Sequence, residues 1–195
     1  MYNETHEDND RSDMPKIWKI AHGKPSISDD DNKKLLDNNY VGMGFDFNNR
    51  QGKNFIKIKS SDYFYLVRDQ KIVLLGQLTG DKAITVGADK SIHNKDKVIE
   101  LTNDHMIGWS FREFKRIGNY PQVPCKFKVI NQLGGMPSSN STVDEVKGNN
   151  LKSFESEVLK PIFDLELIDL KITVPSESYP DISTKKSSLH KNGSM

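Results

Sequence analysis

The stretch from Asp62 to Asp81 constrains the fold more than any other part of this 195-residue chain. Two apolar runs lie on either side of a polar turn at residues 69–71, which is the pattern of a β-hairpin. The first run places every second apolar residue on one face, at Tyr63, Tyr65 and Val67. The second run, Ile72 to Leu75, is apolar without a break. We therefore expect the first strand to bury one face and the second to bury both, inside a small barrel.

Other segments carry weaker signals of secondary structure. We expect strands at 16–21, 40–47, 83–86, 98–101 and 126–130, and loops at 48–54 and 134–150. Residues 55–58 suggest a short strand or turn, and 165–174 a strand or the continuation of a helix. A helix is predicted over 26–39, where Ser28 or Asp29 can cap an acidic first turn that lysines follow. A second helix is predicted over Leu151 to Phe163 from the spacing of apolar residues.

The length of 195 residues leaves little room for a second core, so we expect a single domain. Of 17 aromatic residues, 12 lie between Tyr40 and Phe127, so the core is concentrated there. Residues 1–15 and 175–195 are polar, with too little apolar surface to offset the entropy of ordering. We expect an α+β fold over residues 16–174, built as a small mixed β-barrel with peripheral helices, between a flexible N-terminal segment and a disordered tail.

Charge and hydropathy narrow the function classes. The chain has 28 Lys and Arg against 27 Asp and Glu, so it has no global basic field, and any nucleic-acid contact must come from a local patch. No run approaches the roughly 20 apolar residues that cross a bilayer, and the N-terminus lacks the apolar region of a secretory signal. We expect a cytoplasmic protein without a membrane partner.

No motif in the sequence names a reaction. We find no nucleophile elbow, phosphate loop or cluster of metal ligands, and expect a binding module without catalytic residues, metal or cofactor. A weaker alternative is a small metal-dependent nuclease, in which acidic residues bind Mg²⁺ and a lysine polarises water. Its candidate residues are Asp164, Glu166, Asp169 and Lys171. Alternation of charged and apolar residues is also what any half-exposed strand shows, and we favour that explanation.

Aromatic residues could either fill a core or line a pocket. We expect most of them to be core, but one or two tryptophans at a barrel rim could stack on an unstacked base. His22 follows a predicted strand directly and lies close in sequence to Trp18. We weigh an exposed turn histidine above a ligand contact for it.

The order of segments resembles the PUA-like superfamily, and in particular the EVE-type domains at the N-termini of McrB-like modification-dependent restriction proteins. The similarity is carried by the strand KIWKIAHG, the segment Gly44-Phe45-Asp46, the aspartate-led strand from Asp62 to Arg68, and Ile72 to Gly80, over roughly residues 16–130. Gly-Trp is common in the family where Gly44-Phe45 stands here. Within these 195 residues we expect no GTPase or nuclease domain after the matching segment.

This resemblance implies a mixed barrel whose cleft accepts a nucleobase, often a modified one that has left a duplex. It places Trp18, His22, Phe45 and Trp109 in the base pocket. It assigns Lys53, Lys57, Lys59 and Arg68 to the nucleic-acid backbone. The partner would be DNA or RNA, unmodified or modified, with a protein partner as the source of any catalytic activity. The alternative is a protein-interaction or regulatory module, in which the helix over 151–163 and the tails dock a partner.

Overall fold

The computed structural model describes residues 14–23, 26–44, 50–80, 109–118, 137 and 141–174. For 84–85, 125–126 and 149 it describes the backbone alone. The predictions made for the segments 1–13, 98–101 and 175–195, and for Phe45, lie outside the described residues.

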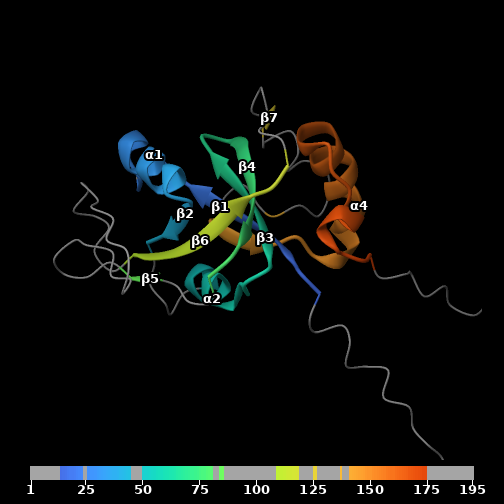
Figure 1. The fold of residues 1–195 in the computed structure, drawn as a ribbon, viewed down its shortest axis with the longest axis horizontal. Coiled ribbons are helices and arrows are strands. Elements are labelled where there is room, and N and C mark those ends of the chain that lie inside the picture. Colours follow the sequence, from blue (N-terminus) through green and yellow to red (C-terminus); the bar gives the residue numbers. More distant parts are fainter. Residues whose placement is uncertain are drawn as a thin grey trace, which may run out of the picture.

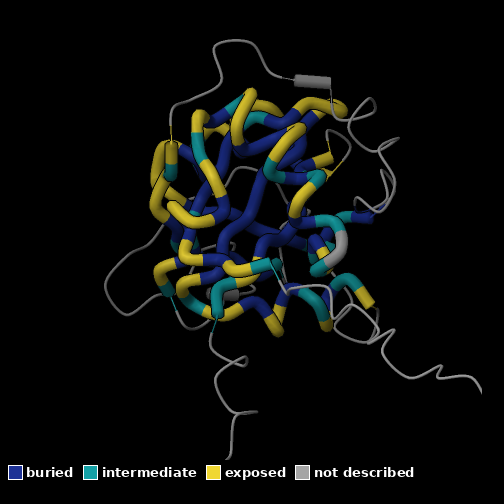
Figure 2. The backbone as a smooth tube through the Cα atoms, turned by 90° about the vertical axis from the view of Figure 1, so that its right-hand side faces the viewer, coloured by how far each residue is buried: buried dark blue, intermediate teal, exposed yellow. Residues whose placement is uncertain are grey.

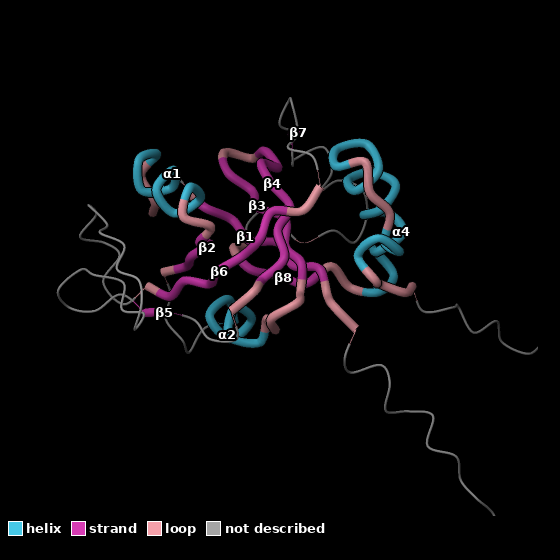
Figure 3. The backbone as a smooth tube through the Cα atoms, viewed as in Figure 1, coloured by secondary structure: helices cyan, strands magenta, loops and turns pink. Residues whose placement is uncertain are grey.

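The described strands form one curled, mixed sheet. They are β1 (Ile17–His22), β2 (Tyr40–Met43), β3 (Tyr63–Arg68), β4 (Lys71–Leu78), β5 (Ile84–Thr85), β6 (Ser110–Arg116), β7 (Cys125–Lys126) and β8 (Val143–Glu145). Their order is β2-β6-β4-β3-β1-β8, with β5 on β6 and β7 on β4, and only the β1/β3 pair is parallel. The sheet curls into a half-barrel, with helices around it (Figures 1 and 3). The fold class is therefore α+β, as expected.

The predicted hairpin is confirmed. β3 and β4 pair antiparallel across Asp69 and Gln70, whose φ angles of 49° and 62° are those of a type I′ turn. The prediction that the first strand buries one face is wrong, because all of β3 is buried. Its even-numbered residues Phe64 and Leu66 pack inside the curl of the sheet, while its odd-numbered residues pack under the C-terminal helices.

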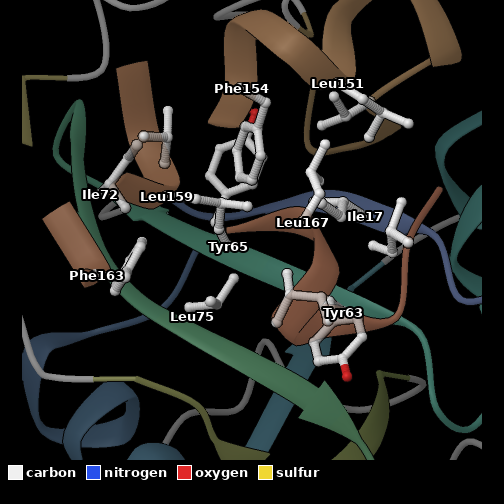
Figure 4. Close-up of a cluster of buried hydrophobic side chains, with 14 of the residues drawn as sticks. Ile17, Tyr63, Tyr65, Ile72, Leu75, Leu151, Phe154, Leu159, Phe163 and Leu167 are labelled. Carbon is white, nitrogen blue, oxygen red and sulfur yellow. The ribbon is translucent and has the colours of Figure 1, made fainter. Parts of the chain in front are cut away.

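Two apolar cores lie on opposite faces of the sheet. One fills the curl of the sheet and is closed by Leu36 and Phe55 from two helices. The other lies between the sheet and the C-terminal helices, where the rings of Tyr65 and Phe154 are 5.1 Å apart (Figure 4). The strands are buried at the centre and the exposed residues lie around them (Figure 2).

The predicted helix over 26–39 is confirmed, and a helix that was not predicted follows it in the chain. α1 (Asp29–Asp37) begins at Ser28, whose hydroxyl accepts a hydrogen bond from the backbone N–H of Asp31 at 3.1 Å. α2 (Arg50–Lys57) occupies residues predicted to be a loop and a short strand or turn. The helical signal was weak because this helix buries only Gly52 and Phe55. This helix is stabilised by a tertiary contact, the packing of Phe55 in the core inside the curled sheet.

The segment 134–150 is not a loop throughout. It contains β8, which pairs antiparallel with β1, and a 3₁₀ turn, η3 (Gly148–Asn150). A strand of three residues gives almost no periodic signal among Gly, Ser and Asn. Val143 is fully buried, and the partner strand rather than the local sequence makes this segment extended.

The predicted C-terminal helix is confirmed as α4 (Leu151–Phe154), which continues as a π-helix, η4 (Glu155–Phe163). Phe154, Val158 and Leu159 of this helix are fully buried against the sheet. The apolar face of the helix is therefore covered by the sheet of the same chain. The segment 165–174 forms a 3₁₀ helix, η5 (Leu167–Leu170), and no strand.

The acidic residues of the nuclease alternative do not form a site. The carboxylate of Asp169 accepts the backbone N–H of Glu166 at 2.8 Å, closing a capping box. The carboxylate of Glu166 pairs with Lys160 at 3.0 Å. Among the described residues no group of His, Cys, Asp and Glu is arranged to hold a metal ion.

Candidate functional site

Among the described strands, β2 lies at the edge of the curled sheet and pairs with β6 alone. Phe114 donates its backbone N–H to the carbonyl of Asn39 at 2.9 Å, which sets the alternation of the β2/β6 ladder. Gly42, opposite Phe111, falls at a position that is not hydrogen-bonded within this pair. Its N–H and C=O therefore face away from β6.

The side chain of His22 closes the gap between β1 and this edge. Its Nε2 lies 3.3 Å from the N and 3.1 Å from the O of Gly42, and its Nδ1 lies 2.7 Å from Oδ1 of Asn32. If Nδ1–H donates to the amide oxygen, Nε2 accepts the N–H of Gly42. Burial lowers the pKa of His22 to about 4, a shift that the Asn32 hydrogen bond opposes and the Arg68 cation reinforces. The neutral ring is thus a structural bridge at pH 7.

A cavity of about 270 Å³ lies beside this bridge. Ala21 and Gly23 line it from the end of β1, and Gly42 to Gly44 from the end of β2. Described residues just before α1, β6 and β8 also line it. Pockets for drug-sized ligands hold about 300–1,000 Å³, so this cavity suits one small ring system.

Trp109 is the aromatic side chain among the described residues of this wall, and two glycines make room for it and its neighbour. A Cβ at Gly44 would lie 2.0 Å from Cε2 of Trp109, and one at Gly42 would lie 2.2 Å from Cδ1 of Phe111. The two rings stack with centroids 6.2 Å apart and planes at 24°. Trp109 is half-buried, whereas Phe111 is fully buried. Of the pair, Trp109 is the ring that a ligand can reach.

Gly44 adds polar groups to the cavity. Extending the β2/β6 register by one residue places Gly44 opposite Trp109, at a position equivalent to Gly42, and the close approach of the two residues agrees with this. Within the part of the chain that the structure describes, neither its N–H nor its C=O makes a hydrogen bond. The strand edge thus offers one donor and one acceptor side by side.

A buried lysine positions the opposite wall. Lys19 is fully buried on β1, and its Nζ donates to the carbonyl of Ser141 at 2.5 Å. Burial lowers its pKa to about 8, against the attraction of Asp144, which raises it. The N–H of Ala21 also bonds the carbonyl of Thr142 at 2.8 Å. These contacts hold the segment before β8 against β1.

The three lysines that were predicted to contact the nucleic-acid backbone are all exposed. Lys53 and Lys57 are exposed on α2, and Lys59 follows it. The side chains of Gln51 and Asn54 bond the N–H and C=O of Val143, the latter at 3.0 Å. Val143 directly follows the cavity wall, so the helix is anchored beside the cavity.

Two predicted site residues are structural instead. The indole of Trp18 is 3% exposed, belongs to the core inside the sheet, and donates its Nε1–H to Oδ2 of Asp62 at 2.9 Å. Arg68 is 8% exposed and donates to the carbonyl of Ile27 at 3.2 Å and to Oδ1 of Asp29 at 2.5 Å. It ties the end of β3 to the start of α1. Neither residue lines the cavity, because both are held inside the fold.

His22 lies behind the cavity wall rather than in it, and the expected exposed histidine is in fact 1% exposed. The sequence reasoning missed Lys19 and the main chain of Gly44. A lysine between Trp18 and Ile20 in an apolar run was the one available signal for a buried amine.

A smaller cavity of about 180 Å³ lies at the start of β1, between Ile17, Val146, Leu151 and Ile172. None of the described residues that line it is aromatic. We therefore take the larger cavity as the candidate site.

A comparison with family models finds no match, and neither does one with curated proteins. Three solved structures are similar in fold. A protein from Rhodopseudomonas palustris, solved by NMR, has 12% identity and a TM-score of 0.43, covering 70% of this chain and 88% of its own. A crystal structure from Agrobacterium tumefaciens has 15% identity, a TM-score of 0.43 and coverage of 74% and 89%. A hypothetical protein from Leishmania major has 12% identity, a TM-score of 0.46 and coverage of 75% and 93%. In the described residues no helix is long and apolar enough to cross a membrane.

Proposed function

We propose that this chain is a non-catalytic nucleic-acid-binding module that receives a single base in the cavity between β1 and β2. The observation that carries the proposal is the pairing of Trp109 with the strand edge at Gly44 in one small cavity. A PUA-like, EVE-type domain and a cytoplasmic location, with a partner protein supplying any catalysis, belong to the same proposal.

The cavity chemistry matches a nucleobase. A base is planar, so it can stack on the exposed part of the Trp109 indole, a contact worth about 1–3 kcal/mol. The edge of a base presents a donor next to an acceptor, which pairs with the N–H and C=O of Gly44. Both features also accept a modified base, provided that the added group fits the remaining volume.

The lysines on and after α2 supply the phosphate contacts. The chain as a whole carries a formal charge of only +1, so attraction to nucleic acid has to be local. Lys53 and Lys57 have no ion-pair partner within the described ranges, and their ammonium groups are exposed. We expect a modest salt dependence, from few phosphate contacts.

Fluorescence of Trp109 tests this proposal directly. The chain has two tryptophans, and Trp18→Phe leaves Trp109 as the only indole while keeping an aromatic ring in the core. This variant is titrated with free nucleosides, and with short DNA and RNA that is unmodified or carries methylated adenine or cytosine. We expect quenching that saturates with at least one of them, and a loss of affinity of at least tenfold in Trp109→Ala, measured by calorimetry.

The matched control is Phe111→Leu, which changes the neighbouring buried ring without removing Trp109. Binding that is equal in Trp109→Ala and the wild type would remove the cavity from the proposal. No saturable binding of any probe would refute nucleic-acid recognition and leave the protein-interaction alternative.

A further inference from the structure

The imidazole of His22 joins three elements that line the larger cavity. The ring belongs to the end of β1, where the residues on either side of it line the cavity. Its Nε2 contacts Gly42 on β2, and its Nδ1 lies 2.7 Å from Oδ1 of Asn32 on α1. The residues just before α1 line the cavity as well. The end of β1, β2 and α1 lie together on one side of the molecule (Figure 1).

Nε2 of this ring faces both main-chain groups of Gly42, and it can bond only one of them. It lies 3.3 Å from the N and 3.1 Å from the O. Without a proton Nε2 accepts the N–H, and with a proton it donates to the C=O. No other group in the described part of the chain bonds either atom. Whichever form the ring takes, one polar group of Gly42 is left for a ligand, and Gly42 lines the cavity.

Asn32 is placed to choose between the two forms. Its amide oxygen faces Nδ1 and can only accept, so Nδ1 carries the proton and Nε2 is an acceptor. The ring then bonds the N–H of Gly42 and leaves the C=O to the cavity. The place of Asn32 is itself fixed, because it is buried on a helix whose start is tied to Arg68.

The surroundings of the ring keep it uncharged at neutral pH. Burial, and after it the Arg68 cation at the end of β3, lower the pKa of His22 to about 4, against the hydrogen bonds that raise it. The guanidinium of Arg68 lies 3.5 Å from the carbonyl of His22. Of the carboxylates at the start of α1, Asp29 pairs with Arg68 and Asp31 is bonded by Ser28. The described strand β2, Tyr40–Met43, brings no charged side chain.

We propose that Asn32 is a positioning residue for the cavity, which selects the form of His22 that offers the C=O of Gly42 to a ligand. The ligand must then bring two donors, one for this carbonyl and one for that of Gly44. Adenine, cytosine and guanine carry an amino group and have at least two N–H donors, whereas a thymine or uracil in a nucleoside has one. The cavity therefore prefers amino-bearing bases. This inference rests on the proposed function, because it concerns the base that the cavity receives.

Nitrogen NMR of the imidazole tests the role of Asn32 without any ligand. The chain has five histidines, and the signal that disappears in His22→Gln identifies the ring. At pH 7 we expect the wild-type ring to carry its proton on Nδ1. Asn32→Leu, which offers no acceptor, should move the proton to Nε2, where the C=O of Gly42 accepts it. A wild-type proton on Nε2, or a proton that stays on Nδ1 in Asn32→Leu, would overturn the inference.

Binding of four nucleosides tests the preference. Quenching of Trp109 is measured in the Trp18→Phe background with adenosine, cytidine, guanosine and uridine. We expect the tightest amino-bearing nucleoside to bind at least about tenfold more tightly than uridine, and Asn32→Leu to reduce this ratio to below about threefold. Lys33→Gln, an exposed substitution on the same helix, should leave the ratio unchanged.

A conservative variant separates positioning from a merely structural role. In Asn32→Asp the carboxylate still accepts from Nδ1, but it raises the pKa of His22. This variant should keep the preference at pH 8.5 and lose it, as the pH falls, at a higher pH than the wild type. Uridine bound as tightly as the others, or a preference that Asn32→Leu leaves intact, would overturn the inference and leave the proposed function standing. Binding of no nucleoside would refute the proposed function and the preference together, and the NMR result would still decide the role of Asn32.

Discussion

Protonation of His22 should destabilise the fold below neutral pH, because the charged imidazole is desolvated in the folded protein. The ring lies behind the cavity with both nitrogens engaged, at Asn32 and at Gly42. Burial, with a contribution from the Arg68 cation, lowers its pKa from 6.5 to about 4. Between these two pH values the unfolded chain binds a proton that the folded chain does not. The free energy of unfolding therefore falls as the pH falls through this window.

The size of the effect follows from the two pKa values. A histidine that titrates at 6.5 in the unfolded chain and near 4 in the folded one should reduce the free energy of unfolding by about 2 kcal/mol between pH 7 and pH 5. The full effect, about 3 kcal/mol, is reached only below pH 4. Stability at neutral pH contains this contribution completely.

Urea unfolding of the wild type and of His22→Gln isolates this contribution. Glutamine reaches toward Gly42 with an amide in place of Nε2 and does not titrate. All other titrating groups are common to the two proteins, so the difference in their pH dependence reports His22 alone. Parallel curves for the two proteins between pH 7 and pH 5 would refute the buried, neutral bridge.

Four further variants test other features of the structure. Gly44→Ala should weaken base binding at least tenfold, because its Cβ would lie 2.0 Å from the Trp109 ring. In Gly76→Ala the new Cβ would lie 2.6 Å from the ring of Phe64 in the core. This variant should lower the free energy of unfolding by about 1–3 kcal/mol in urea without changing the affinity for the base. The carboxylate of Asp62 accepts three hydrogen bonds, from the backbone N–H groups of Lys16 and Lys59 and from the indole N–H of Trp18. Asp62→Ala should therefore lower the free energy of unfolding by at least about 3 kcal/mol in the same assay. An unchanged urea midpoint would contradict this. Burial lowers the pKa of Lys19 from 10.5 to about 8. Between pH 8 and pH 10.5 the unfolded chain therefore binds a proton that the folded chain has lost. The stability of the wild type relative to Lys19→Met should increase as the pH rises through this range. A stability difference that stays constant over that range would show that the lysine is not desolvated.

Local patterns in the sequence were enough to predict the elements whose stability is encoded within them. The hairpin has its turn chemistry at Asp69 and Gln70 between two apolar runs, and α1 has its cap at Ser28. The helix that begins at Leu151 has a full apolar stripe. In each case the interacting residues are close in the chain, so the pattern is visible without the fold.

The tertiary structure alone decided α2, β8 and the candidate site. α2 and β8 are short, and each is stabilised by the partner that it packs on rather than by its own propensity. The site brings together the ends of β1 and β2 with Trp109, and its main features are a bridge from His22 to Gly42 and a strand edge at Gly44. Main-chain hydrogen bonds and the curl of a sheet cannot be read from the types of the residues that take part in them. For that reason the sequence determined that this chain forms an aromatic-rich α+β fold, and only the structure determined which aromatic side chain remains open to a ligand.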